Sequence, residues 1–296
     1  MPNWHEINNE LKESGSSQDI IRRKYLNLLS EKTGRNTILY YSGWLQKSNI
    51  PGLQVNDADK NGLMTVIHKL ERNKGLDLIL HTPGGETAAT ESIVDYLKSM
   101  FGDDIRAIIP QLAMSAGTMI ACSLMGKQSS LGPIDPQFGG IPAHGIVEEF
   151  KRAYTEIKAD NTKMAVWQPI LNKYNPTLVG ECEKAIKWSE QMVEDWLRAN
   201  MLNGDADVDD KVKTILEELG DHSVNLSHSR HLSSEKCKQI GLNVTDLEAD
   251  SEIQDLVLSV HHSCIHTLSS TNAFKMIENQ NGIAFIQSQQ NMIVPR

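Results

Sequence analysis

The chain has 296 residues, with 38 acidic and 29 basic side chains and a formal net charge of −9 at pH 7. This excess of negative charge argues against a protein that binds nucleic acid or an anionic membrane through a broad basic surface. No run of about 18 apolar residues occurs, and the polar N-terminal residues show no signal segment, so we expect no membrane span. The four cysteines include no C-x-x-C pair, which argues against a zinc site or a disulfide framework and favours reduced thiols in the cytoplasm.

Helices and strands are expected to alternate in the N-terminal part of the chain. Apolar residues at helical spacing predict helices over 21–29, 61–70 and 88–100, and short apolar runs predict strands over 37–41, 76–80 and 105–110. This alternation is typical of an α/β protein, in which helices flank a parallel sheet.

Two turns follow neighbouring strands of this predicted sheet. The strand at 76–80 ends in Thr82-Pro83-Gly84-Gly85, and the strand at 105–110 leads into Met114-Ser115-Ala116-Gly117. Because the carboxyl ends of parallel strands meet at one edge of a sheet, we expect the two turns to lie side by side.

Ser115 has two interpretations. It can cap the following helix, which we expect to end near Gly126, and capping is the commoner role of serine there. It can also be a nucleophile, because the small residues at 116–118 leave its hydroxyl accessible. Backbone N–H groups of Gly84, Gly85 and Ala116 would then form an oxyanion hole for a tetrahedral intermediate.

Three motifs together resemble the serine dehydrogenase proteinase family, with a likeness that extends from about residue 36 to 289: 81–85 (HTPGG), 114–121 (MSAGTMIA) and 130–137 (SLGPIDPQ). That family is similar to signal peptide peptidase A and, more distantly, to the Clp protease subunit and the crotonases. The resemblance implies a ClpP/crotonase-like α/β fold with a helical insertion, and a serine peptidase with Ser115 as its nucleophile.

Four segments are expected. They are an N-terminal helical segment (1–34), the α/β core with the nucleophile (35–144), a helical insertion (145–220), and the C-terminal part of the core with oligomerisation elements (221–296). Helices are predicted in the insertion over 147–159, 164–173, 179–200 and 208–219. Beyond it we expect a helix capped by Ser233 or Ser234 and an edge strand at 282–287.

A serine hydroxyl needs a neighbouring base to act as a nucleophile at neutral pH. Lys158 and His144 are the two candidates. Signal peptide peptidases use a lysine from this region, but a lysine serves only if burial lowers its pKa, whereas histidine needs no such shift. The alternatives are a solvated helix face for Lys158 and an ordinary loop position for His144. If neither acts, Lys151 and Lys163 are next.

The resemblance to Clp proteases is incomplete at two catalytic positions. In Clp proteases the loop that matches 130–137 carries the catalytic histidine. This chain has Asp135 at that place. The simplest interpretation of Asp135 is a turn residue between two prolines. The catalytic aspartate of Clp proteases corresponds to Asn225. The resemblance therefore implies a Ser/Lys or Ser/His dyad, or an inactive relative.

Three classes of function remain. The first is a cytoplasmic serine peptidase that cleaves peptides or unfolded proteins as a homo-oligomer. The second is a crotonase-type enzyme on acyl thioesters, and the third is an inactive scaffold. His262 and His266 have the i, i+4 spacing of metal ligands, but no nearby glutamate completes a zincin motif. We expect no metal, no cofactor and no nucleic-acid partner.

Overall fold

The computed structural model describes residues 6–7, 9–10, 18–120, 123–220 and 227–289. The chain divides into two compact units, Met1–Leu131 with His231–Arg296, and Gly132–Arg230. None of the helices in the described ranges combines the length and the apolar character that crossing a membrane requires.

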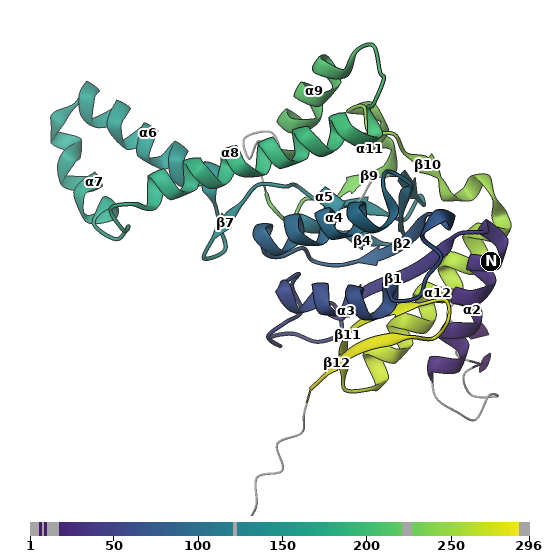
Figure 1. The fold of residues 1–296 in the computed structure, drawn as a ribbon. Coiled ribbons are helices and arrows are strands. Elements are labelled where there is room, and N and C mark those ends of the chain that lie inside the picture. The colour runs from purple at the N-terminus through teal and green to yellow at the C-terminus, as the bar shows by residue number, and fades with distance from the viewer. Residues whose placement is uncertain (1–5, 8, 11–17, 121–122, 221–226, 290–296) are drawn as a thin grey trace, which may run out of the picture. The chain divides into compact units, whose positions relative to one another are not determined.

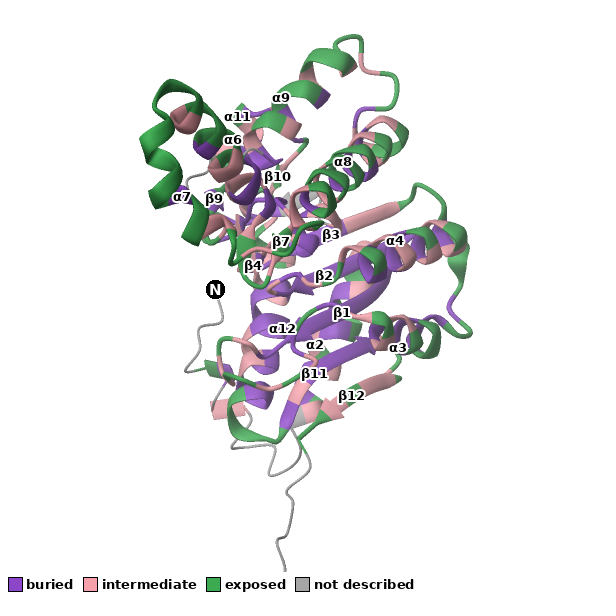
Figure 2. Ribbon diagram, turned by 90° about the vertical axis from the view of Figure 1, so that its left-hand side faces the viewer, coloured by how far each residue is buried: buried purple, intermediate pink, exposed green. Residues whose placement is uncertain are grey.

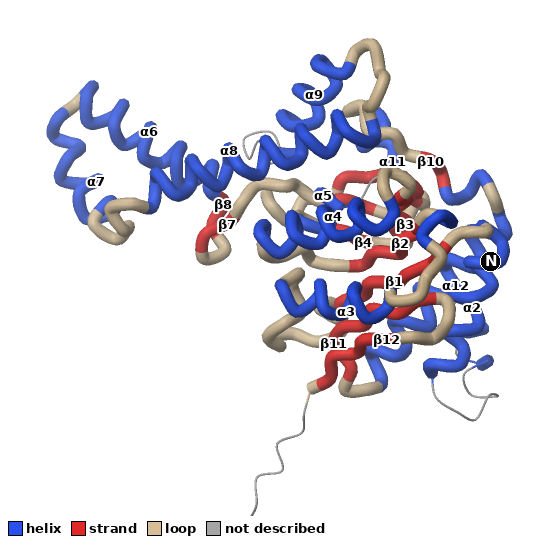
Figure 3. Tube along the Cα trace, in the orientation of Figure 1, coloured by secondary structure: helices blue, strands red, loops and turns tan. Residues whose placement is uncertain are grey.

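The first unit is built on a seven-stranded sheet with the order β10-β5-β3-β2-β1-β11-β12 (Figures 1 and 3). The strands from β10 to β1 are parallel, and β11 and β12 are antiparallel additions, with β12 at the edge as expected. The bounds are β1 Asn36–Ser42, β2 Leu76–His81, β3 Ile105–Ile109, β5 Ser123–Met125, β10 Thr245–Asp246, β11 Ala273–Asn279 and β12 Ala284–Ser288. The prediction of an α/β fold with a parallel sheet is confirmed.

Helices α2 (Gln18–Thr33) and α12 (Ser251–Ser270) cover one face of this sheet. In-register pairing places Leu39 beside Ile79 and Ile79 beside Ile108, and these side chains share one buried core with Leu26 of α2 and Val260 of α12. Figure 2 shows the central strands β1 and β2 as buried ribbons. Burial on both faces explains why the strands are short continuous apolar runs.

Helices α3 (Asp57–Ile67) and α4 (Thr87–Phe101) flank the other face. Asn56 caps α3, because its side chain accepts from the Ala58 N–H at 3.0 Å. A Cβ on Gly62 would come within 2.7 Å of the Ile277 side chain on β11, so the helix packs closely on the sheet there.

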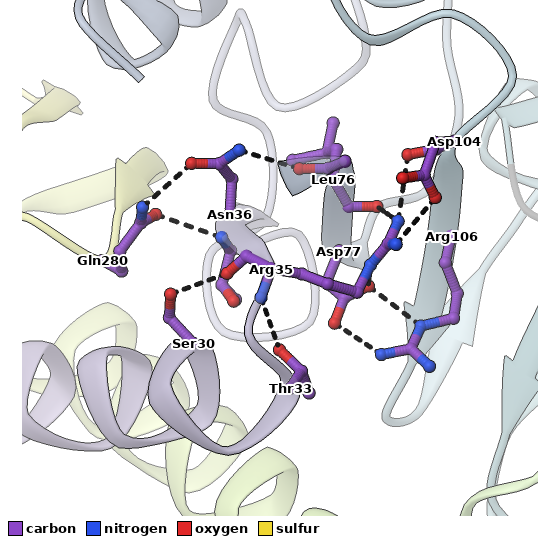
Figure 4. A network of polar contacts seen from close by, with 11 residues as sticks. Ser30, Thr33, Arg35, Asn36, Leu76, Asp77, Asp104, Arg106 and Gln280 are labelled. Carbon is purple, nitrogen blue, oxygen red and sulfur yellow. Dashed lines mark hydrogen bonds and ion pairs between the residues drawn. The ribbon is translucent and has the colours of Figure 1, made fainter. Parts of the chain in front are cut away.

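The amino ends of β1, β2 and β3 are joined by an ion-pair network (Figure 4). The Asp77 carboxylate is fully buried and pairs with Arg35 Nε at 2.7 Å and with Arg106 at 2.6 Å. Arg35 also pairs with Asp104 at 2.7 Å. This network lies at the opposite end of the strands from the predicted site, and loss of either arginine would leave the buried Asp77 charge less compensated.

A three-stranded sheet follows the carboxyl end of β2. Its members are β4 (Leu112–Ala113), β6 (Ser130–Leu131) and β9 (Leu232–Ser233). Helix α5 is described over Ala116–Ile120. The expected continuation of this helix to near Gly126 is wrong, because β5 pairs with β3 in the central sheet. A short apolar run is compatible with a buried strand as well as with a helix. Here the pairing with β3 makes these residues a strand.

The second unit is mainly helical, and the four helices predicted there are present: α6 Ala143–Ala159, α7 Met164–Leu171, α8 Leu178–Trp196 and α9 Val208–Gly220. Helices α6 and α8 pack through Ile146 and Cys182. A hairpin, β7 (Gln137–Phe138) with β8 (Ile141–Pro142), precedes α6. In the first unit, Ser233 caps α11 (Ser234–Gln239) as predicted. Short helical turns are also present at Arg72–Lys74, Asn161–Lys163, Leu197–Met201 and Leu247–Ala249.

Candidate active site

The turns that follow β2 and β4 are hydrogen-bonded to each other. The Thr82 N–H donates to the Leu112 carbonyl at 3.2 Å, and the Met114 N–H donates to the Thr82 carbonyl at 3.0 Å. This ladder brings the glycine turn and the serine turn together, as the sequence predicts.

Gly84 lies directly against Ser115. A Cβ on Gly84 would be 2.7 Å from Ser115 Cβ and 2.8 Å from the Ala116 nitrogen. Gly84 also has a φ of +89°, which side chains other than glycine rarely adopt. The close approach and the backbone conformation both require glycine here.

Ser115 has a φ of +52°, in the left-handed region, which costs about 1–2 kcal/mol for an L-residue. The turn is held by its neighbours: the Gly117 N–H donates to the Met114 carbonyl and the Thr118 N–H to the Ser115 carbonyl, both at 2.8 Å. Among the described residues, no group hydrogen-bonds to Ser115 Oγ. The side chain therefore does not cap α5, and its hydroxyl is left for another role.

Two backbone N–H groups beside Ser115 lack an acceptor within the described part of the chain: those of Gly85 and Ala116. The Gly84 N–H, by contrast, lies 3.2 Å from Thr82 Oγ1. The Val55 N–H donates to the Gly84 carbonyl and the Glu86 N–H to the Val55 carbonyl. In such a parallel pairing the Gly85 N–H points away from Val55.

The segment around Val55 is anchored by a buried ion pair. Lys275 Nζ lies 2.9 Å from Asp59 and donates to the Gln54 carbonyl at 2.7 Å. Asp59 in turn accepts from Tyr40 Oη at 2.7 Å and from the Asn56 N–H at 2.9 Å. Burial lowers the pKa of Lys275 and raises that of Tyr40. The network fixes the backbone on both sides of Val55.

A cluster of aromatic and histidine rings lies at the end of β2. His81 is fully buried, and its ring centroid is 4.3 Å from Trp44, 5.3 Å from Tyr41 and 5.5 Å from His261. Burial lowers the pKa of His81 to about 3, so the ring is neutral at neutral pH. Nowhere in the described ranges do three or more His, Cys, Asp or Glu side chains gather to hold a metal ion.

The two sequence-predicted bases are both on α6, in the unit Gly132–Arg230, whereas Ser115 belongs to the other unit. Lys158 is exposed, with Nζ 5.7 Å from the Tyr154 ring centroid. His144 is half-buried and lines a pocket with Glu190, Glu194, Arg198, Asp209, Val212, Lys213, Leu216 and Glu217.

The remaining positions singled out from the sequence fall in different places. Lys151 and Lys163 are exposed, and Lys163 pairs with Glu156 at 3.3 Å. Asn225 lies outside the described residues.

Sequence reasoning missed one pair of side chains. Asp135 is buried, and its Oδ1 lies 2.5 Å from His228 Nδ1. The two residues are separated by 93 positions. The only local signal is an aspartate held between Pro133 and Pro136.

Comparisons with known proteins place the chain in a family and agree with its α/β fold. The sequence matches the model of a family described as ClpP-like SDH-type serine proteinases over residues 22–274. One uncharacterised protein of Methanocaldococcus jannaschii is 32% identical over 190 residues, which are 63% of this chain and 57% of that protein. A second from the same organism is 28% identical over 245 residues, 80% of this chain and 78% of that protein. The chain thus matches little more than half of the first relative.

Proposed function

Because the chain belongs to the family of ClpP-like SDH-type serine proteinases, we propose that it is a serine peptidase and that Ser115 is its nucleophile. The observation that carries this proposal is the conformation of Ser115. The residue is held at a φ of +52° against Gly84, with its hydroxyl engaged by none of the described groups. Backbone strain of this kind, maintained by surrounding hydrogen bonds, is typical of functional sites.

The chemistry proposed is acyl transfer. Ser115 Oγ attacks the carbonyl carbon of a peptide bond, and negative charge develops on the carbonyl oxygen. The N–H groups of Gly85 and Ala116 are the donors that we assign to this oxygen, because they have no acceptor within the residues described. A single donor of this type contributes on the order of a hundred-fold or more in rate.

Ser115 needs a base, and Lys158 and His144 are the candidates that the sequence provides. The exposed position of Lys158 does not favour it, because a lysine needs burial to become neutral near pH 7. His144 needs no such burial. Alanine substitution tests each one: loss of the true base should reduce hydrolysis nearly to the level of Ser115→Ala.

The substrates that we propose are peptides or unfolded proteins, because the family is described as one of serine proteinases. We further propose a cytoplasmic homo-oligomer that works without a cofactor. A crotonase-type enzyme on acyl thioesters is the alternative, because it uses the same backbone donors but has no use for the Ser115 hydroxyl. A non-catalytic scaffold is the third candidate.

A fluorophosphonate probe separates these three functions. We expect it to label Ser115, located by peptide mass spectrometry, and we expect the wild-type protein to hydrolyse fluorescein-labelled casein. Ser115→Ala should abolish both and leave the far-UV circular dichroism unchanged. Ser99→Ala is the matched control, because Ser99 is an exposed serine on α4. Comparable hydrolysis by wild type and Ser115→Ala would refute the proposal.

A further inference from the structure

A buried threonine contacts both turns of the candidate site through its side chain. Thr82 follows β2 directly and is fully buried, and its Oγ1 accepts from the Gly84 N–H at 3.2 Å. Its methyl group lies against Gly117 in α5, where a Cβ would be 2.5 Å from Thr82 Cγ2. The hydroxyl thus holds the glycine turn, and the methyl group packs against the turn that follows Ser115.

The backbone of Thr82 is held independently of its side chain. Thr82 forms an isolated parallel pair with Ala113 on β4, and its N–H and carbonyl make the two hydrogen bonds between the turns described above. A substitution that changes only the Thr82 side chain should therefore leave the two turns together. Its effect reports on the hydroxyl or the methyl group alone.

The hydroxyl of Thr82 also connects the glycine turn to a buried ion pair. Burial and the Asp59 carboxylate raise the pKa of Tyr40 on β1, and a hydrogen bond from the Thr82 side chain opposes that rise. Tyr40 Oη donates to Asp59 Oδ2 at 2.7 Å, and Asp59 pairs with Lys275 at 2.9 Å. A line of hydrogen bonds thus runs from the Gly84 N–H to the ion pair.

The carboxylate at one end fixes the direction of every hydrogen bond in this line. A carboxylate only accepts hydrogen bonds, so the Tyr40 hydroxyl donates to Asp59 and has only its oxygen left for Thr82. Thr82 in turn donates to Tyr40 and has only its oxygen left for the Gly84 N–H. Each donor therefore points towards Asp59, and hydrogen bonds aligned in this way strengthen one another in a buried site.

The same ion pair holds the segment on the other side of the glycine turn. Lys275 and Asp59 bond to the backbone before and after Val55. Val55 in turn pairs with Gly85. The turn is therefore held through Val55 on one side and through Thr82 on the other. An oxyanion donor stabilises the transition state best when its position is fixed before the charge develops.

Resting on the proposed peptidase function, we propose that Thr82 is a positioning residue, whose hydroxyl, supported by Tyr40, holds the oxyanion turn in its active geometry through Gly84. Thr82 itself contacts neither the substrate nor the reacting atoms in this scheme. Loss of its hydroxyl releases the Gly84 N–H from the line of hydrogen bonds and lets the neighbouring donor move. The effect should therefore fall on the chemical step and leave substrate binding nearly unchanged.

The test separates the hydroxyl from the methyl group in the full-length protein. Thr82→Val keeps the branched shape and the packing against Gly117, and it removes only the hydroxyl. We expect it to lower kcat for casein hydrolysis by about ten-fold or more with little change in KM, since misplacing a catalytic group by about 1 Å can cost about a hundred-fold. Fluorophosphonate labelling of Ser115 should slow by a similar factor. Thr82→Ser keeps the hydroxyl and should retain most of the wild-type kcat.

Tyr40→Phe tests the support of the Thr82 hydroxyl, because it removes the phenol oxygen and keeps the ring. It should lower kcat in the same direction. Since both residues act through one line of hydrogen bonds, the double variant should lose no more than the larger single loss, rather than the product of the two. Losses that multiply would overturn the role of Tyr40.

Thr267→Val is the matched control. Thr267 is a buried threonine of α12, on the other face of the sheet, and its hydroxyl donates to the Ser263 carbonyl and accepts from Arg22. Its substitution removes a buried hydroxyl in the same way but lies outside the line that ends at Gly84. Thr267→Val should keep the wild-type kcat even where it lowers stability in urea as much as Thr82→Val does.

The outcomes separate this inference from the proposed function. A folded Thr82→Val protein with the wild-type kcat, beside an inactive Ser115→Ala, overturns the inference and leaves the proposed function standing. Equal losses of kcat in Thr82→Val and Thr267→Val also overturn it, because they would report lost stability alone. If Thr82→Val does not fold, Tyr40→Phe decides in its place, and a wild-type kcat there overturns the inference. Hydrolysis by Ser115→Ala overturns the proposed function itself.

Discussion

Val55 and Gly85 form an isolated parallel pair in which the Val55 backbone contacts the glycine so closely that a Cβ on Gly85 would lie 2.3 Å from both the Val55 nitrogen and the Val55 oxygen. This pair fixes the orientation of the Gly85 N–H. It also connects the oxyanion donor that we propose to the buried ion pair of Lys275 and Asp59.

Gly85→Ala should strongly reduce hydrolysis, because the added methyl group pushes the Val55 segment away and moves the Gly85 N–H. The expected loss is on the order of a hundred-fold or more in kcat/KM. Gly180→Ala on α8 is the control, since a Cβ there meets nothing within 4 Å. Casein hydrolysis measures both variants, and full activity in Gly85→Ala would show that the oxyanion hole has been misplaced.

An alanine variant is usually more stable than a glycine variant at the same position, and we expect Ser115 to be an exception. A left-handed φ costs alanine about 1–2 kcal/mol, which offsets the roughly 1 kcal/mol that glycine ordinarily costs in an ordered segment. We expect Ser115→Gly to be at least as stable as Ser115→Ala in urea unfolding. Ser99 lies inside α4, so Ser99→Gly should be less stable than Ser99→Ala by about 1 kcal/mol. The same order at both positions would contradict the strain assigned to Ser115.

Lys275→Met should destabilise the protein by about 3–5 kcal/mol, because it leaves the Asp59 carboxylate buried without its partner. Adding Asp59→Asn should restore much of the loss, since it removes the uncompensated charge. Urea unfolding at pH 7 gives the values. Lys184→Met, which breaks the exposed pair with Glu181, should change stability little. A Lys275→Met protein as stable as wild type would mean that the pair does not anchor the Val55 segment.

Stability should fall with acidity because of His81. Its pKa is lowered to about 3 in the folded protein, so below about pH 6.5 the unfolded chain binds a proton that the folded protein does not. The loss per pH unit approaches about 1.4 kcal/mol between those two values. We therefore expect His81→Phe to lose about 2 kcal/mol less than wild type between pH 7 and 5.

Urea unfolding at both pH values tests the effect of His81, with His68→Phe at an exposed position as control. His261 also has a pKa lowered by burial, so some acid sensitivity remains in the His81 variant. Equal losses in wild type and His81→Phe would show that His81 takes up its proton without opening the fold.

The sequence by itself determined the alternation of helices and strands, the parallel sheet and the meeting of the two turns. Each depends on short-range information. The spacing of apolar residues distinguishes helices from strands. The proline and glycines at 83–85 mark the end of β2. The same reasoning failed at 123–125, because a short apolar run is compatible with both a helix and a strand. In the structure these residues form β5, which pairs with β3.

Only the tertiary structure decided which charged and titratable groups meet. Lys275 and Asp59 are 216 residues apart and His228 and Asp135 are 93 apart, and no local pattern pairs them. The strain at Ser115 is equally invisible in the sequence, because serine accepts several backbone conformations and the surrounding hydrogen bonds select one. Contacts between distant segments depend on how the whole chain packs, so local propensity predicts the elements of this protein but not the partners of its buried polar groups.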